Sequence, residues 1–213
     1  MKNTIEEIFK EKVLCIFYGG SHAYGLASEK SDKDVMVIID DNKPLRHYIY
    51  FNDLTKERIE CFIVGRSYFK KVHSFDDDTN DFVVAHADNI LGLKFHNTLI
   101  YIDESYKNEF NQIVCEDWSL KLAKFLHRFV SFYKLTIQYD APNYKKHYHV
   151  YRIRAMLDNL DLTGSFDLTY VEPYKTIMTV FKDHYRFIPS KHKEINEILD
   201  YIKDYANRLE EKK

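Results

Sequence analysis

One glycine-containing segment constrains this chain more than any other stretch: residues 18–35, YGGSHAYGLASEKSDKDV. It lies between two apolar runs, residues 13–17 and 35–39, each typical of a short buried strand. Gly19 and Gly20 stand near its start, and Asp32 and Asp34 stand near its end. A hairpin turn needs only about two to five residues. The length and the charges of this segment therefore predict a functional loop between two strands.

The composition is that of an ordinary globular chain. The 213 residues allow one large domain or two small ones, and the net charge of −2 indicates no global attraction to nucleic acid, so any such surface must be local. No apolar region follows the first two residues and no apolar run is long enough to cross a membrane, so we expect a cytoplasmic protein without a secretory leader. The cysteines, at 15, 61 and 115, are expected to be buried thiols without disulfides.

Apolar periodicity predicts strands in the first third of the chain and helices in the second half. We expect strands over 13–18, 34–39, 47–51 and 57–64, and helices over 5–11, 66–73, 118–137, 144–160, 173–185 and 191–210. A capping box at Thr4–Glu7 would begin the first helix. Residues 74–81 are expected to form an acidic loop, and residues 82–110 show no clear pattern. This order predicts an α+β fold.

Two aspartates at the end of the glycine-containing segment indicate a metal site. Asp32 and Asp34 are two apart at the entry to a strand, so their side chains would point to the same face and repel each other unless a cation neutralises them. Mg²⁺ takes oxygen ligands of this kind, often together with substrate phosphates. Glu60, with apolar neighbours on both sides in a strand, is the third candidate ligand. Three carboxylates around one point are the ligands of a two-metal phosphoryl-transfer site.

The start of the segment suits a phosphate. Gly19 and Gly20 carry no side chains that would keep a triphosphate from backbone N–H groups, and the Ser21 hydroxyl can donate a hydrogen bond to it. A helix beginning at Ser21 would add amide donors. Gly20 and Ser21 are therefore predicted phosphate-binding residues.

A basic stretch in the second half indicates a second phosphate contact. Residues 141–156, APNYKKHYHVYRIRAM, hold four Lys or Arg, two His and no acidic residue. On a helix, Lys145, His149 and Arg152 would share one face, which suits an NTP tail or a nucleic-acid backbone. Tyr148 lies beside that face and could stack on a base.

These motifs resemble the DNA polymerase β-like nucleotidyltransferase superfamily. Residues 20–25, GSHAYG, and 31–34, SDKD, are similar to its Gly-Ser turn and Asp-x-Asp pair, most of all in the branch associated with RNA repair. Residues 145–152 and Gly164 are more loosely similar to a C-terminal helix of that branch. Val35 and Met36 depart from it, because members often carry an aromatic or acidic residue there.

The resemblance implies a small mixed-sheet nucleotidyltransferase core with flanking helices over residues 1–115 and a helical domain over 116–213. It implies transfer of a nucleoside monophosphate from an NTP to an acceptor hydroxyl, with release of pyrophosphate and with two Mg²⁺ or Mn²⁺ ions. Asp32 and Asp34 would bind metal. Glu60 would bind the catalytic metal or act as base, and Gly20 and Ser21 would hold the triphosphate.

Several alternatives stay open at this point. The acceptor could be RNA, as a tRNA or a broken RNA end, which the resemblance and the basic stretch favour; it could also be a protein or a small molecule. The chain could instead be a nucleotide-binding or RNA-binding regulator with little catalysis. In simpler interpretations, Asp32 and Asp34 cap a turn, Glu60 pairs with Arg58 or a lysine, and the basic stretch is a solvated face.

Overall fold

The computed structural model describes residues 1–24, 27, 31–52, 57–75, 90–95, 98–139, 144–166 and 192–211, apart from the side chains of 52, 136–139, 144–146 and 192. The chain divides into two compact units, Met1–Glu116 and Asp117–Lys213. Each unit has its own buried side chains. The expected helix over 173–185 and most of the expected acidic loop over 74–81 lie outside the described residues.

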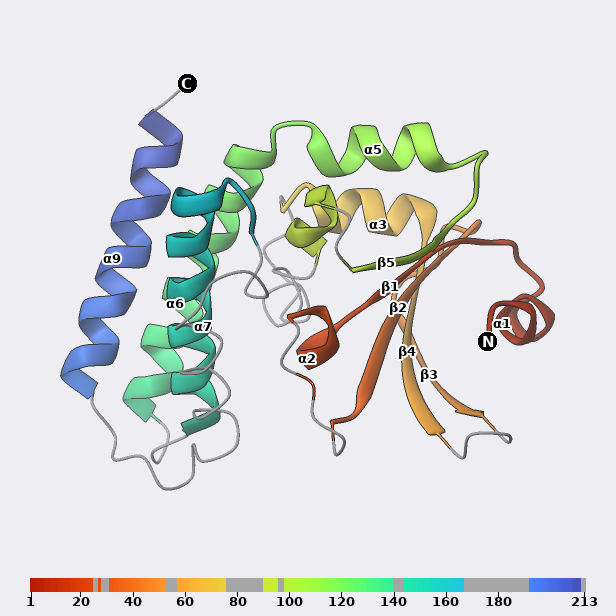
Figure 1. The fold of residues 1–213 in the computed structure, drawn as a ribbon, viewed down its shortest axis with the longest axis horizontal. Coiled ribbons are helices and arrows are strands. Elements are labelled where there is room, and N and C mark those ends of the chain that lie inside the picture. Colours follow the sequence, from red (N-terminus) through yellow and green to blue (C-terminus); the bar gives the residue numbers. More distant parts are fainter. Residues whose placement is uncertain are drawn as a thin grey trace. The chain divides into compact units, whose positions relative to one another are not determined.

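The first unit is built on a mixed five-stranded sheet of order β3-β4-β2-β1-β5 (Figure 1). In chain order its described elements are α1 (Lys2–Phe9), β1 (Val13–Tyr18), α2 (Gly20–Ala23), β2 (Lys33–Ile39), β3 (Arg46–Asn52), β4 (Glu57–Gly65), α3 (Arg66–His73), η1 (Leu93–Phe95), β5 (Leu99–Ile102) and α5 (Lys107–Cys115). Strands β2 and β4 pair in parallel, and the other neighbouring strands pair antiparallel. The parallel pair at the centre matters most, because it carries the candidate carboxylates.

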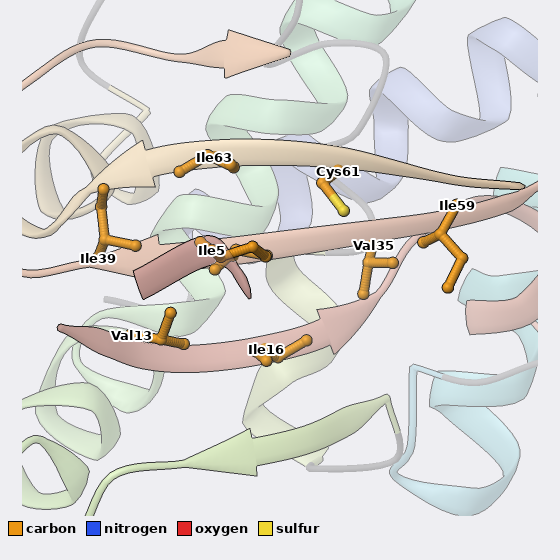
Figure 2. Close-up of a cluster of buried hydrophobic side chains, with 9 residues drawn as sticks. Ile5, Val13, Ile16, Val35, Ile39, Ile59, Cys61 and Ile63 are labelled. Carbon is orange, nitrogen blue, oxygen red and sulfur yellow. The ribbon is translucent and has the colours of Figure 1, made fainter. Parts of the chain in front are cut away.

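Strict alternation divides β4 between the two faces of the sheet. Ile59, Cys61 and Ile63 are buried in an apolar cluster that also contains Ile5 of α1 (Figure 2). Strands β1 and β2 contribute the remaining members of the cluster, which are Val13, Ile16, Val35, Val37 and Ile39. Because successive strand residues point to opposite faces, Glu60 points away from this cluster.

The opposite face of the sheet is covered by α3 at one end. Phe69 of α3 packs against Phe17 of β1, with the ring centroids 6.5 Å apart, and Phe110 of α5 stacks on Phe69 at 6.4 Å. Phe17 is the register partner of Met36, which is 1% exposed. This aromatic packing fixes α3 on the face to which Asp34 and Glu60 also belong.

The second unit consists, in its described part, of α6 (Trp118–Tyr139), α7 (Tyr144–Thr163) and α9 (His192–Glu211). Each contributes a stripe of buried apolar residues at helical spacing, as the sequence predicts for α6. The fully buried residues include Leu122 and Leu126 of α6, Val150, Ile153 and Leu157 of α7, and Ile195, Leu199 and Ile202 of α9. Hydrogen bonds from Tyr201 to Asp158 (3.1 Å) and from Tyr205 to Asp161 (2.6 Å) join α9 to α7.

The predicted α+β class is confirmed, with two differences in detail. The first helix spans Lys2–Phe9 instead of 5–11: its first turn forms earlier, with the Ile5 N–H donating to the Met1 carbonyl and Lys2 paired with Glu6, so Thr4 is not a cap. It ends where Lys10 takes a left-handed conformation, φ 57°. Cys115 is exposed at the end of α5, so the prediction of three buried thiols was wrong for this residue.

The structure also adds elements that the sequence did not indicate, β5 and α5, within and just after the unassigned stretch. No helix in the described part of the chain is both long and apolar enough to cross a membrane. The boundary after Glu116 separates two compact units of the structure. The assignment of these units as independent domains stays a prediction.

Candidate functional site

The parallel pairing of β2 and β4 brings two of the predicted carboxylates side by side. Asp34 is the register partner of Glu60, and Val35 is the partner of Cys61. Opposed residues of neighbouring strands point to the same face, so Asp34 and Glu60 both lie on the face away from the Ile5 cluster. Both side chains are half-buried. The sheet thus places the strand of Glu60 directly beside that of Asp34.

Asp32 lies just outside this pair. It precedes β2, two residues before Asp34, and its side chain is exposed. Among the described residues, no group of three or more His, Cys, Asp and Glu side chains is close enough to hold a metal ion. Of the three predicted ligands, Asp34 and Glu60 therefore form a pair, and Asp32 lies just before the first residue of β2.

The backbone of Gly20 lies close to the carboxylate of Asp34. Its φ is +55°, which favours glycine, and a Cβ built on it would lie 2.3 Å from Asp34 Oδ2. The backbones of the two segments are also hydrogen-bonded, because the Gly19 N–H donates to the Asp34 carbonyl at 2.9 Å. Gly20 then begins α2, a single turn that includes Ser21. The sequence predicted that Gly20 gives phosphate access; its close approach to Asp34 was not foreseen.

Two basic side chains lie beside Glu60 on the sheet. Arg58 Nη2 lies 2.7 Å from Glu60 Oε1, and His47 Nε2 lies 3.3 Å from Glu60 Oε2. The His47 ring stacks on Phe62, with the centroids 5.0 Å apart. The Arg58 pair is the one named among the simpler interpretations. His47 was missed, because its proximity depends on the antiparallel register of β3 on β4.

The predicted basic face of α7 is partly present. His149 Nδ1 lies 3.2 Å from Arg152 Nη2, and Arg152 Nη1 lies 3.8 Å from Met156 Sδ. Arg152 is only 3% exposed, whereas an open phosphate-binding face would leave it accessible. The side chain of Lys145 lies outside the described part. The structure thus brings His149 and Arg152 together within the second unit, while Asp34 and Glu60 belong to the first.

The donor set suits a divalent cation in its chemistry. Asp34 and Glu60 offer carboxylate oxygens on one face, with Asp32 two residues upstream, and Mg²⁺ prefers such ligands. Gly20 itself places no side chain against the Asp34 carboxylate, where a Cβ would lie 2.3 Å from Oδ2. Arg58 and His47 would compete with a cation for the Glu60 carboxylate.

Comparison with known proteins gives one family match. The family model described as a nucleotidyltransferase domain matches residues 2–87, which include β1 to β4 and α3. No protein of curated function shows significant sequence similarity to the chain.

Among solved structures, the chain is similar to a nucleotidyltransferase-like protein from Exiguobacterium sibiricum 255-15. The identity is 15% and the TM-score 0.36, over 97% of this chain and 73% of that one, and no functional conclusion rests on so distant a likeness. The family match alone carries weight. Residues 2–87 are similar to a nucleotidyltransferase domain, and this similarity supports nucleotidyl transfer as the general activity of the chain.

Proposed function

We propose that the chain is a divalent-metal-dependent nucleotidyltransferase that moves a nucleoside monophosphate from an NTP to a hydroxyl of RNA and releases pyrophosphate. One observation carries the proposal: Asp34 and Glu60 are register partners on one face, with the Gly20 backbone against the Asp34 carboxylate. This arrangement occurs inside the segment that matches the nucleotidyltransferase family model.

The roles of the chain's own residues follow from their positions. Asp34, Asp32 and Glu60 would hold one or two Mg²⁺ or Mn²⁺ ions, which supply charge neutralisation for the phosphates when bound. Glu60 is the residue beside Asp34 that could instead accept the proton of the acceptor hydroxyl. Ser21, half-buried in α2, would donate its hydroxyl to a phosphate oxygen, and Gly20 would leave the backbone of that turn accessible.

RNA as the acceptor rests on the resemblance of the GSHAYG and SDKD motifs and on the basic stripe of α7. In that role Lys145, His149 and Arg152 would bind the RNA backbone or the NTP tail. A specific observation favours a second candidate, transfer to a protein or a small molecule: Arg152 is buried at 3% exposure instead of standing on an open face.

The test is a labelling experiment with the full chain. Each of the four NTPs, labelled at the α-phosphate, is incubated with Mg²⁺ or Mn²⁺ and total RNA or cell lysate, and the labelled fraction is identified. We expect label on RNA that disappears in Asp34→Asn and in Glu60→Gln and after chelation with EDTA. Label on protein or small molecules alone supports the second candidate, and NTP binding without any transfer overturns both.

A matched control variant is available on the same strand. Glu57 of β4 pairs with Lys33 at 3.0 Å. It lies two residues before Ile59 and therefore shares the face of Ile59, opposite to that of Glu60. Glu57→Gln removes one carboxylate from β4 without altering the Asp34–Glu60 face. It should transfer label at the wild-type rate.

A further inference from the structure

The edge strand β3 presents an unusual row of exposed side chains. Its residues alternate: Tyr48 and Tyr50 pack against the buried Ile5 cluster, whereas His47, Ile49 and Phe51 point the other way. Ile49 is 46% exposed and Phe51 is 53% exposed. Most strands with one buried face put polar residues on the other, so an exposed isoleucine and phenylalanine here need a reason.

The register of the sheet places this row beside the candidate carboxylates. Ile49 is the partner of Glu60, which is itself the partner of Asp34, so these three side chains form one line across β3, β4 and β2 on one face. Phe51 is the partner of Arg58 in the same way. The exposed apolar residues are therefore continuous with the face on which transfer would occur.

This end of the face is more open than the end covered by α3. Along β4, the residues on the face of Glu60 change from Val64, at 3% exposure, through half-buried Phe62 and Glu60, to exposed Arg58. Arg58 and His47 have side chains about half exposed, at 51% and 47%. A partner can thus reach Ile49, Phe51 and Arg58 from solvent.

The chemistry of the row indicates what that partner is. A flat aromatic ring next to an aliphatic side chain suits a nucleobase, whose stacking on aromatic residues tolerates any sequence. A guanidinium carries five N–H donors, so Arg58 can contact a phosphate while Nη2 stays on Glu60. His47 adds a second polar contact at the other end of the row. Single-stranded nucleic acid offers both flat base rings that stack and an anionic backbone.

We propose that Ile49, Phe51, Arg58 and His47 form the docking surface for the unpaired end of the acceptor RNA, a proposal that rests on the proposed function for the choice of RNA. A terminal base lies on Phe51 and Ile49, and the adjoining phosphate lies at Arg58. Because Ile49 is in register with Glu60, a base bound there brings its ribose hydroxyls toward the carboxylates. The surface selects an exposed, unstacked end and excludes a blunt duplex.

Binding tests this surface without any catalysis. A fluorescent single-stranded RNA of about ten nucleotides, within the range of known single-strand site sizes, is titrated with the full chain in the absence of NTP and metal. We expect Phe51→Ala to weaken binding roughly tenfold or more and Ile49→Ala to weaken it less. The matched control is Ile8→Ala in α1: Ile8 is 47% exposed, as Ile49 is, but lies outside this row.

Unchanged binding in both Phe51→Ala and Ile49→Ala, or an equal loss in Ile8→Ala, overturns the docking surface. A blunt RNA duplex that competes as well as the single strand also overturns it. Photo-crosslinking with a 5-iodouridine-substituted strand is a second measurement, which should label the β3 peptide that contains Phe51.

Transfer kinetics keep this proposal distinct from the proposed function. We expect Phe51→Ala to raise KM for RNA while KM for the NTP stays unchanged. Wild-type transfer to RNA with the same RNA KM in Phe51→Ala overturns the docking surface and leaves the proposed function intact. Single-strand binding that depends on Phe51, without transfer from any NTP, overturns the proposed function and supports the docking surface.

Discussion

At the scale of single residues, Gly20 is the position where a minimal change should have the largest effect. Its φ of +55° costs a non-glycine residue about 1–2 kcal/mol, and a new Cβ would lie 2.3 Å from Asp34 Oδ2. Gly20→Ala should therefore destabilise the fold by about that amount and displace the Asp34 carboxylate. A misplacement of about 1 Å at a catalytic group costs about 10²-fold in rate. Urea unfolding and the rate of label transfer measure the two effects.

Gly164 separates backbone strain from the contact with Asp34. It also has a positive φ, +73°, but a Cβ built there would meet no atom within 4 Å. Gly164→Ala should lose a similar amount of stability and keep the wild-type transfer rate. If Gly20→Ala keeps its transfer rate as well, the close approach of Gly20 to Asp34 has no part in the reaction.

The cysteines give a second prediction at the residue scale. Burial raises the pKa of the Cys61 thiol to about 11 and raises the pKa of Cys15 further, whereas Cys115 is exposed. At pH 8 only about one in a thousand Cys61 side chains would be the reactive thiolate. Ellman's reagent should therefore titrate one thiol quickly in the native protein and three in denaturant. Cys115→Ser should abolish the fast phase, and a fast phase that persists would contradict the burial of the other two.

At the scale of elements, the sequence predicts what is set by local patterns. The continuous apolar run of β2 and the alternation of β4 identify both strands, and the position of Glu60 follows from the second. β5 could not be predicted, because its four residues form a strand only through long-range pairing with β1, such as that of Cys15 with Ile102. The Arg58–Glu60 pair was open to sequence reasoning. The approach of His47 was not, since it depends on how β3 pairs with β4.

The junction of α1 with β1 depends on one carboxylate. Glu6 Oε1 accepts hydrogen bonds from Lys2 Nζ at 2.8 Å and from the Val13 N–H at 3.0 Å. The bond from Lys2, followed by that from Val13, lowers the pKa of Glu6. A carboxylate with a lowered folded-state pKa stabilises the fold above its unfolded value of about 4.3, and this contribution is lost as the pH falls through the folded value.

Glu6→Gln should therefore lower the free energy of unfolding at pH 7, by no more than about 1 kcal/mol for a partly exposed pair. The variant should also lose less stability than the wild type between pH 7 and pH 3. Urea unfolding at the two pH values measures both. Glu7→Gln, on the exposed side of the same helix, is the control and should follow the wild type. If Glu6→Gln and the wild type lose the same amount of stability between pH 7 and pH 3, Glu6 does not fix the junction.

At the scale of the whole molecule, the two compact units predict two unfolding transitions. Ile63 of β4 lies in the core of the first unit and Leu199 of α9 in the second, and both are fully buried. Truncation of such residues to alanine costs about 2–5 kcal/mol. Ile63→Ala and Leu199→Ala should therefore each lower a different transition in calorimetry.

Nucleotide binding then shows which transition belongs to the proposed catalytic face. A ligand that binds the folded state stabilises the unit that holds it, by about 2.7 kcal/mol at 100 times its Kd. Mg²⁺ with a nonhydrolysable NTP should raise only the transition that Ile63→Ala lowers, and Asp34→Asn should abolish the rise. A rise in the other transition as well would show that the basic stripe of α7 holds the triphosphate. One transition lowered by both truncations would show that the two units fold as a single domain.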